Sequence, residues 1–174
     1  ALDGANAATA DGIAFTAIEA LDANDQVDTV TLLAGNDAVQ VDAANAATTS
    51  GIAFTNIEAV AGNGGTDAVT LTAGDDTLQV DGPNAATTSG IAFTAIASVA
   101  GAAGNDSVTL AAGNADTITL DGANAATASG IALTEIEALD TNDLSDTVTL
   151  LAGDDTVQVD GANAATTSGI AFTN

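Results

Sequence analysis

The sequence predicts an all-β fold, a parallel β-solenoid (β-helix or β-roll) built from 39-residue repeats with about two rungs per repeat. The first observation is a block reading Gly-Ile-Ala-Phe/Leu-Thr, which recurs at steps of 39, 39, 40 and 39 residues. Its copies begin at Gly12, Gly51, Gly90, Gly130 and Gly169. The second observation is that short runs of alternating apolar and small polar residues lie between Gly, Asn and Asp, which is typical of strands.

The first elements of a repeat are two short strands. A "VTL" strand is expected first, and an A-G-Asx turn such as "AGND" at 34–37 follows it. The second strand alternates over "AVQVD" at 38–42. The four "VTL" strands are at 30–32, 69–71, 108–110 and 148–150.

The rest of the repeat is a polar bend, "NAATTSG" at 45–51, followed by "IAFTNIEAV" at 52–60. Alternation places Ile52 and Phe54 on one face, and the three-residue step to Ile57 predicts a corner at Thr55–Asn56. The Asn that opens each bend is expected to recur for a structural reason, by stacking in successive repeats. These residues are Asn6, Asn45, Asn84, Asn124 and Asn163.

The chain is expected to form a single repetitive solenoid domain over residues 1–174. Its repeat units cover about 3–41, 42–80, 81–120 and 121–159, with a partial unit at 160–174. Neither end resembles the polar cap of a free solenoid, and uncapped strand edges recruit further strands. We therefore expect part of a longer array, or a chain that stacks head to tail with copies of itself.

The charge balance limits the classes of partner. The chain has 24 acidic residues, no Lys, Arg or His, and a formal net charge of -24. This charge repels phosphate, so nucleic acid and anionic membranes are disfavoured, while solvent cations and self-association remain. No apolar run is long enough for membrane insertion, and the absence of cysteine excludes disulfides. A chain that starts at Ala1 without Met is expected to be processed, as in a secreted protein, or part of a longer one.

Several Gly- and Asp-rich stretches are similar to a known repeat. "GNGGTDAVT" (62–70) and "LTAGDDTLQ" (71–79) resemble the Gly-Gly-x-Gly-x-Asp-x-apolar-x repeats of secreted bacterial RTX proteins, and "AGAAGNDSV" (100–108) and "LLAGDDTVQ" (150–158) are looser versions. The wider wording is similar to the repeat regions of giant bacterial surface proteins: adhesins, haemagglutinin-like fibres and S-layer types. The resemblance implies an extracellular or cell-surface location in bacteria, and calcium as a ligand.

Calcium binds six to eight oxygen atoms, which carboxylates and turn carbonyls supply. The candidate ligands are Asp37, Asp67, Asp75, Asp76, Asp106, Asp154 and Asp155. The alternative is a solvated acidic face in which these residues form Asx turns. The third unit has only three acids, at Asp81, Asp106 and Asp116, which argues against a metal in every rung.

Function is expected to be structural: an extracellular acidic fibre, or a surface-layer or adhesin stalk, with no catalytic site. A calcium-binding module is the alternative, and an ice-binding solenoid is a lesser one, based on one expected column of Thr31, Thr70, Thr109 and Thr149. Catalysis is disfavoured because the chain lacks His, Lys, Cys, Arg and Tyr. The pair Glu135 and Glu137 is expected to lie on one solvent-facing strand without a sugar platform.

Overall fold

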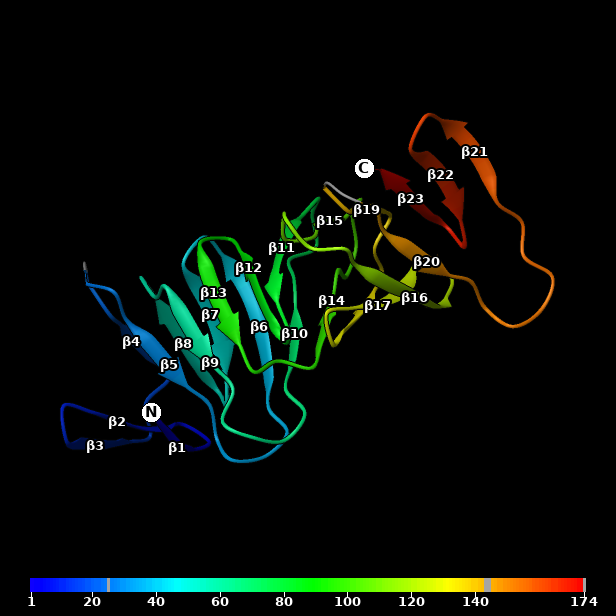
Figure 1. Ribbon diagram of the computed structural model, residues 1–174. Helices are drawn as coiled ribbons and strands as arrows, with labels where there is room; N and C mark the ends of the chain where they lie inside the picture. The colour runs from blue at the N-terminus through cyan, green and yellow to red at the C-terminus, as the bar shows by residue number, and fades with distance from the viewer. Residues whose placement is uncertain (25, 143–144, 174) are drawn as a thin grey trace.

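The computed structural model describes residues 1–24, 26–142 and 145–173, and the described residues form strands and turns without a helix (Figure 1). The all-β solenoid that the sequence predicts is therefore confirmed. No helix among the described residues is long and apolar enough to cross a membrane. The strands belong to two kinds of group, three-stranded antiparallel meanders and single strands.

The meanders are β1 (Leu2–Gly4), β2 (Ala7–Ala10) and β3 (Ile13–Thr16); β6 (Ala38–Ala43), β7 (Ala46–Thr49) and β8 (Ile52–Thr55); β11 (Thr77–Gly82), β12 (Ala85–Thr88) and β13 (Ile91–Thr94); β16 (Thr117–Gly122), β17 (Ala125–Ala128) and β18 (Ile131–Thr134); and β21 (Gln158–Gly161), β22 (Ala164–Thr167) and β23 (Ile170–Thr173). The single strands are β4 (Ala20–Asp22), β5 (Thr29–Thr31), β9 (Ala59–Ala61), β10 (Ala68–Thr70), β14 (Ser98–Ala100), β15 (Ser107–Thr109), β19 (Ala138–Asp140) and β20 (Thr147–Thr149).

Each meander begins with a strand that bends at an irregularity in its register, between Val41 and Ala43 in the second repeat. The hydroxyl of Thr48 donates a 2.7 Å hydrogen bond to the carboxylate of Asp42 across this bend. The same Thr-to-Asp bond, six residues apart, recurs in every repeat at 2.6 to 2.7 Å. It ties the first two strands of each meander together.

Parallel pairing joins the groups into two ten-stranded sheets. The sheet that contains β4 has the order β20-β16-β17-β18-β14-β10-β6-β7-β8-β4, and the sheet that contains β5 has the order β21-β22-β23-β19-β15-β11-β12-β13-β9-β5. We call them the β4 sheet and the β5 sheet. The chain crosses between them after every group, and β1, β2 and β3 form a separate sheet.

A complete repeat has three strand groups, which are one meander and two single strands. The sequence predicts about two rungs per repeat. Because three is an odd number, successive meanders lie on opposite sheets: β6–β8 on the β4 sheet, then β11–β13 on the β5 sheet. Strands that pair in parallel are offset by 30 or 31 residues, as for Val39 and Val69, or by 33 or 34, as for Val60 and Phe93. The register offset thus differs from the 39-residue sequence period.

Alternation decides which side chains fill the space between the sheets. Ile52 and Phe54 are buried, with 0% and 4% exposed surface, as the period of two predicts. The corner after Thr55 is also present, since Asn56 has a φ of 55° and turns the chain out of the strand. The small residues of the polar bend point inward too, because the bend is a strand, β7, in which Ala47 and Thr49 are buried.

Successive repeats touch through their turns. Asn45 has a φ of 54°, a left-handed conformation that Asn tolerates, and its N–H donates a 2.8 Å bond to the Ser89 carbonyl oxygen of the next repeat. Its side chain packs against Gly90, where a Cβ atom would collide with it. The contact recurs at Asn6 with Ser50, Asn84 with Ser129, and Asn124 with Ser168. The recurring Asn therefore has a structural role, but the contact that the structure shows is with the Ser and Gly of the next repeat and not with the next Asn, as the expected stacking would require.

The expected column of four Thr residues is wrong. Thr31 and Thr109 are on the β5 sheet, whereas Thr70 and Thr149 are on the β4 sheet, because the single strands alternate between sheets. Thr70 has Gln40 and Ala100 as its neighbours. The basis on which an ice-binding surface was expected is therefore absent.

Candidate functional site

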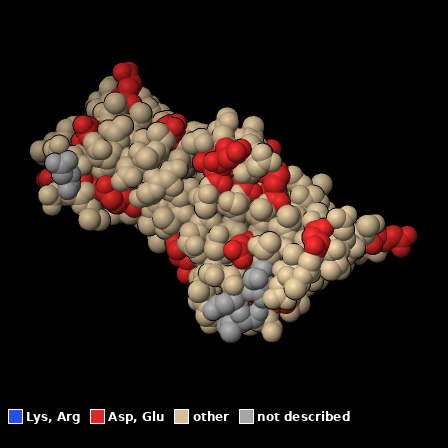
Figure 2. Space-filling model, turned by 90° about the horizontal axis from the view of Figure 1, so that it is seen from above, with Lys and Arg blue, Asp and Glu red and all other residues tan. Residues whose placement is uncertain are grey.

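Acidic residues gather at the positions from which strands begin. An acid stands directly before β5, β6, β9, β10, β11, β15, β16, β19 and β20. These acids are Asp28, Asp37, Glu58, Asp67, Asp76, Asp106, Asp116, Glu137 and Asp146. Parallel neighbours begin at the same edge of a sheet, so their acids are brought together. Figure 2 shows acidic side chains in separate groups along the face that it presents.

Five of these carboxylates accept a backbone hydrogen bond from an acid that precedes a neighbouring strand: Glu58, Asp67, Asp106, Glu137 and Asp146. Oδ1 of Asp67 accepts the N–H of Asp37 at 2.9 Å, and Oδ1 of Asp106 accepts the N–H of Asp76 at 2.8 Å. Glu137 accepts the N–H of Asp106 at 2.9 Å. The bonds lie where the chain enters the sheet, so the carboxylate takes the place of a backbone carbonyl and extends the ladder by one bond.

Two of these carboxylates lie inside the protein. Asp67 has 0% and Asp106 has 1% of its surface exposed, and Oδ2 of each is buried without a hydrogen-bond partner. Glycine makes the burial possible: a Cβ atom on Gly62 would lie 2.5 Å from Oδ2 of Asp67, and one on Gly101 would lie 2.5 Å from Oδ2 of Asp106. The same Cβ atoms would also collide with the carbonyl oxygens of Ala95 and Glu135.

The environment favours the protonated form of Asp106 and of Asp37. Burial raises the pKa of the Asp106 carboxyl above its ordinary value, and the negative charges of Asp76, Glu137 and Asp75 raise it further. Burial likewise raises the pKa of Asp37, with a contribution from the charge of Asp67. A proton or a cation in either group would relieve both the repulsion and the lack of bonding partners.

Five of the seven aspartates proposed from the sequence as calcium ligands come together in two groups. Asp37 lies with Asp67, and Asp75 and Asp76 lie with Asp106. Asp154 and Asp155 are exposed and take no part in either group. Within residues 1–24, 26–142 and 145–173, no three carboxylates converge closely enough to hold a metal ion.

Sequence reasoning missed Asp28, Glu58 and Glu137, which occupy the same position before a strand. Glu58 accepts hydrogen bonds from the N–H of Asp28 at 2.9 Å and from the side-chain amide of Asn45 at 3.1 Å. Glu137 accepts the equivalent amide bond from Asn124 at 2.6 Å. The signal was an Asp two residues before each "VTL" block, together with the Glu of the Ile-Glu-Ala stretches at 57–59 and 136–138.

The expected placement of Glu135 and Glu137 on one strand is wrong. Glu135 has a φ of 57° and lies at the corner after β18, whereas Glu137 precedes β19 and is half-buried. The corner arises because the chain changes sheets here. The two carboxylates therefore do not share a solvent-facing surface.

Comparisons with known proteins give no further assignment: no family model, no curated protein and no solved structure matches the chain. The similarity to RTX repeats therefore rests on sequence pattern, and function has to be argued from the geometry.

Proposed function

We propose that the chain is a structural protein, an acidic β-solenoid that forms part of an extracellular fibre or of a surface-layer or adhesin stalk on a bacterial cell. The observation that carries this proposal is the turn contact between Asn and the Ser of the next repeat. It recurs at all four junctions, at 2.7 to 2.9 Å. Because the contact is the same at every junction, any number of repeats can be stacked in the same way. This property suits a structural element that has to be long and rigid.

Composition supports the same proposal. The chain has no Lys or Arg, so it offers trypsin-like proteases no cleavage site, and its charge of -24 keeps separate fibres apart. The partners proposed are further copies of the repeat and solvent cations. No catalytic role is proposed, because the clustered acids are held by backbone bonds and no nucleophile or basic side chain accompanies them.

A second candidate is a calcium-binding module. The buried, unpartnered Oδ2 atoms of Asp67 and Asp106 favour it, because a cation there would supply the missing partner. Turn carbonyls and the neighbouring Asp37 and Asp76 would provide further oxygen ligands.

Thermal unfolding followed by circular dichroism, with excess chelator and with added calcium, separates the two functions. A structural solenoid stabilised by stacking keeps its β signal and its midpoint in chelator. A calcium-dependent module loses both in chelator and regains them with calcium but not with the same ionic strength of sodium. The second result would overturn the structural proposal in favour of the calcium-binding one.

A further inference from the structure

The two ends of the solenoid expose side chains that are buried in every internal repeat. At one end Ile13 and Phe15 are 59% and 37% exposed, whereas the equivalent Ile91 and Phe93 are 0% and 1% exposed. At the other end Val157 and Val159 are 46% and 76% exposed. Their equivalents Leu78 and Val80 are 1% and 0% exposed. Exposed apolar side chains therefore lie at both ends of the coil.

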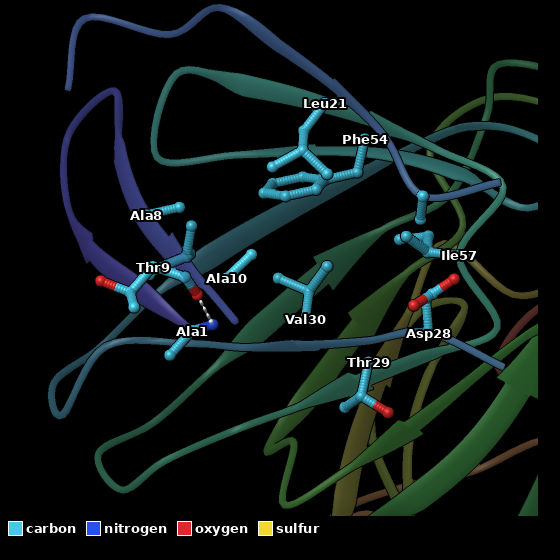
Figure 3. Close-up of a pocket in the computed structure, with 12 residues that line it drawn as sticks. Ala1, Ala8, Thr9, Ala10, Leu21, Asp28, Thr29, Val30, Phe54 and Ile57 are labelled. Atoms are coloured by element: carbon cyan, nitrogen blue, oxygen red, sulfur yellow. Dashed lines mark hydrogen bonds between the residues drawn. The ribbon is translucent and has the colours of Figure 1, made fainter. Parts of the chain in front are cut away.

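A cavity of about 110 Å³ lies under the first meander (Figure 3). Leu2, Leu21, Val30, Phe54 and Ile57 line it. In later repeats the position of Leu2 is taken by Val41, Val80 and Leu120. The residue two places before each of these pairs with the second single strand that follows, which is β10, β15 or β20. The pairs are Val39 with Val69, Leu78 with Val108, and Ile118 with Val148. Val30 is the corresponding single-strand residue; its strand β5 is the last of its sheet, and its side chain lines the cavity.

The C-terminal meander and the residues before it repeat the start of the chain. Residues 160–174 repeat residues 3–17 with identity at 12 of 15 positions, so the two segments fit the same place in the coil. Val157, the repeat equivalent of Leu78, stands directly before β21. The C-terminal copy is also less acidic, because Ser168 stands where the first copy has Asp11.

We propose that residues 156–173 of one chain replace residues 1–17 in the coil of a second chain, so that copies join by exchange of a meander. Val157 then lies beside Val30 of the second chain and fills the cavity. Gln158 lies beside Thr31, as Gln79 lies beside Thr109 within one chain. The N–H of Asn163 bonds to the carbonyl oxygen of Ser50, the acceptor that Asn6 now occupies.

The displaced meander is the one that the fold holds least. β1, β2 and β3 form a sheet of their own, whereas β21–β23 join the β5 sheet through the pairing of β23 with β19. Exchange replaces the contacts of the first meander by nearly identical ones and adds the parallel pairs of β20 with β4 and of the 156–158 segment with β5. The proposed exchange rests on the proposed fibre function and specifies how two copies of the chain are joined.

Cysteine cross-linking tests the joint, since the chain has no cysteine of its own. Two single variants, Gln158→Cys and Thr31→Cys, are mixed, warmed below the unfolding midpoint to allow exchange, and oxidised mildly. We expect a disulfide-linked heterodimer on a non-reducing gel. The matched control mixes Gln158→Cys with Thr109→Cys, because Thr109 already has Gln79 and Asp140 on either side.

A second pair of variants tests the cavity. Val157→Asp places a charge in the apolar interior of the proposed joint, so we expect it to abolish self-association. The control is Val27→Asp, at a loop residue that is 83% exposed, which should leave self-association unchanged. Sedimentation of the unmodified chain separates the outcomes. If it self-associates but Gln158→Cys and Thr31→Cys link no better than the control, the exchange is wrong and the fibre proposal stands. If it remains monomeric at every concentration, both fail.

Discussion

The amide N–H of Asp76 donates a 2.8 Å hydrogen bond to Oδ1 of Asp106, a residue thirty places further along the chain and 1% exposed. Two acids on neighbouring strands are thus tied by a backbone bond while their charges repel. The bond is structural, and the second oxygen of Asp106 is left without a hydrogen-bond partner. This combination determines how the protein responds to substitution and to pH.

Replacing Asp106 by Asn is expected to stabilise the fold by on the order of 1 kcal/mol at neutral pH. Asn keeps the oxygen that accepts the Asp76 N–H, and its NH₂ group can donate to the Glu135 carbonyl oxygen beside it, while the charge is lost. Urea unfolding measures the change, with the exposed Asp154→Asn as the control. A lower midpoint for Asp106→Asn than for the unaltered chain would instead indicate that the carboxylate holds a cation.

Stability is expected to rise as the pH falls from about 8 toward about 4. The raised pKa values of Asp37 and Asp106 mean that folding favours their protonated forms, so their contribution is fully present below the ordinary Asp pKa and is lost as the pH rises through the raised value. Hydrogen bonds lower the pKa values of the fully exposed Asp22 and Asp160. The contribution of these two groups to stability therefore has the opposite pH dependence, and it is lost only in stronger acid. Thermal midpoints across this range measure the trend, and the matching control is Asp106→Asn, in which the trend should be weaker because only the contribution of Asp37 remains.

Gly62→Ala is expected to destabilise the fold by roughly 2 to 4 kcal/mol, because the new Cβ would meet the Asp67 carboxylate and the backbone oxygen of Ala95, and backbone cannot move aside cheaply. Gly35→Ala is the control, since a Cβ there meets nothing within 4 Å. Chemical denaturation of the two variants is the measurement. Equal stability would show that Asp67 is not held against Gly62.

Gly90→Ala is expected to cost about 1 to 3 kcal/mol, through its φ of +78° and the collision with the Asn45 side chain. Adding Asn45→Gly removes the collision and keeps a residue suited to a φ of 54°, so the double variant should recover part of the loss. A double-mutant cycle in urea measures this coupling. Strictly additive effects would mean that the Asn45 side chain is not packed against Gly90.

The sequence was sufficient for the solenoid, the Ile52 and Phe54 face and the corner at Asn56, because strong alternation and a constant step mark them. It was insufficient for the meanders. Ala47 and Thr49 are buried in β7, but Ala and Thr occur equally in turns, so the strand was read as a bend. Small side chains suffice there because each meander folds back on its own neighbouring strands.

The pairing of acids was hidden for a different reason. The sequence period aligns Asp37 with Asp76, 39 residues apart, whereas the sheet pairs Asp37 with Asp67, 30 residues apart. The two periods differ because successive repeats lie on opposite sheets, which no single repeat reveals. Candidate ligands were therefore found as residue types, but not as groups.

Electron microscopy of the purified chain over a range of concentrations tests the central claim most directly. The account predicts unbranched rods longer than one chain, which persist in excess chelator and shorten when Val157 is replaced by Asp. Monodisperse single-chain particles at every concentration would contradict it.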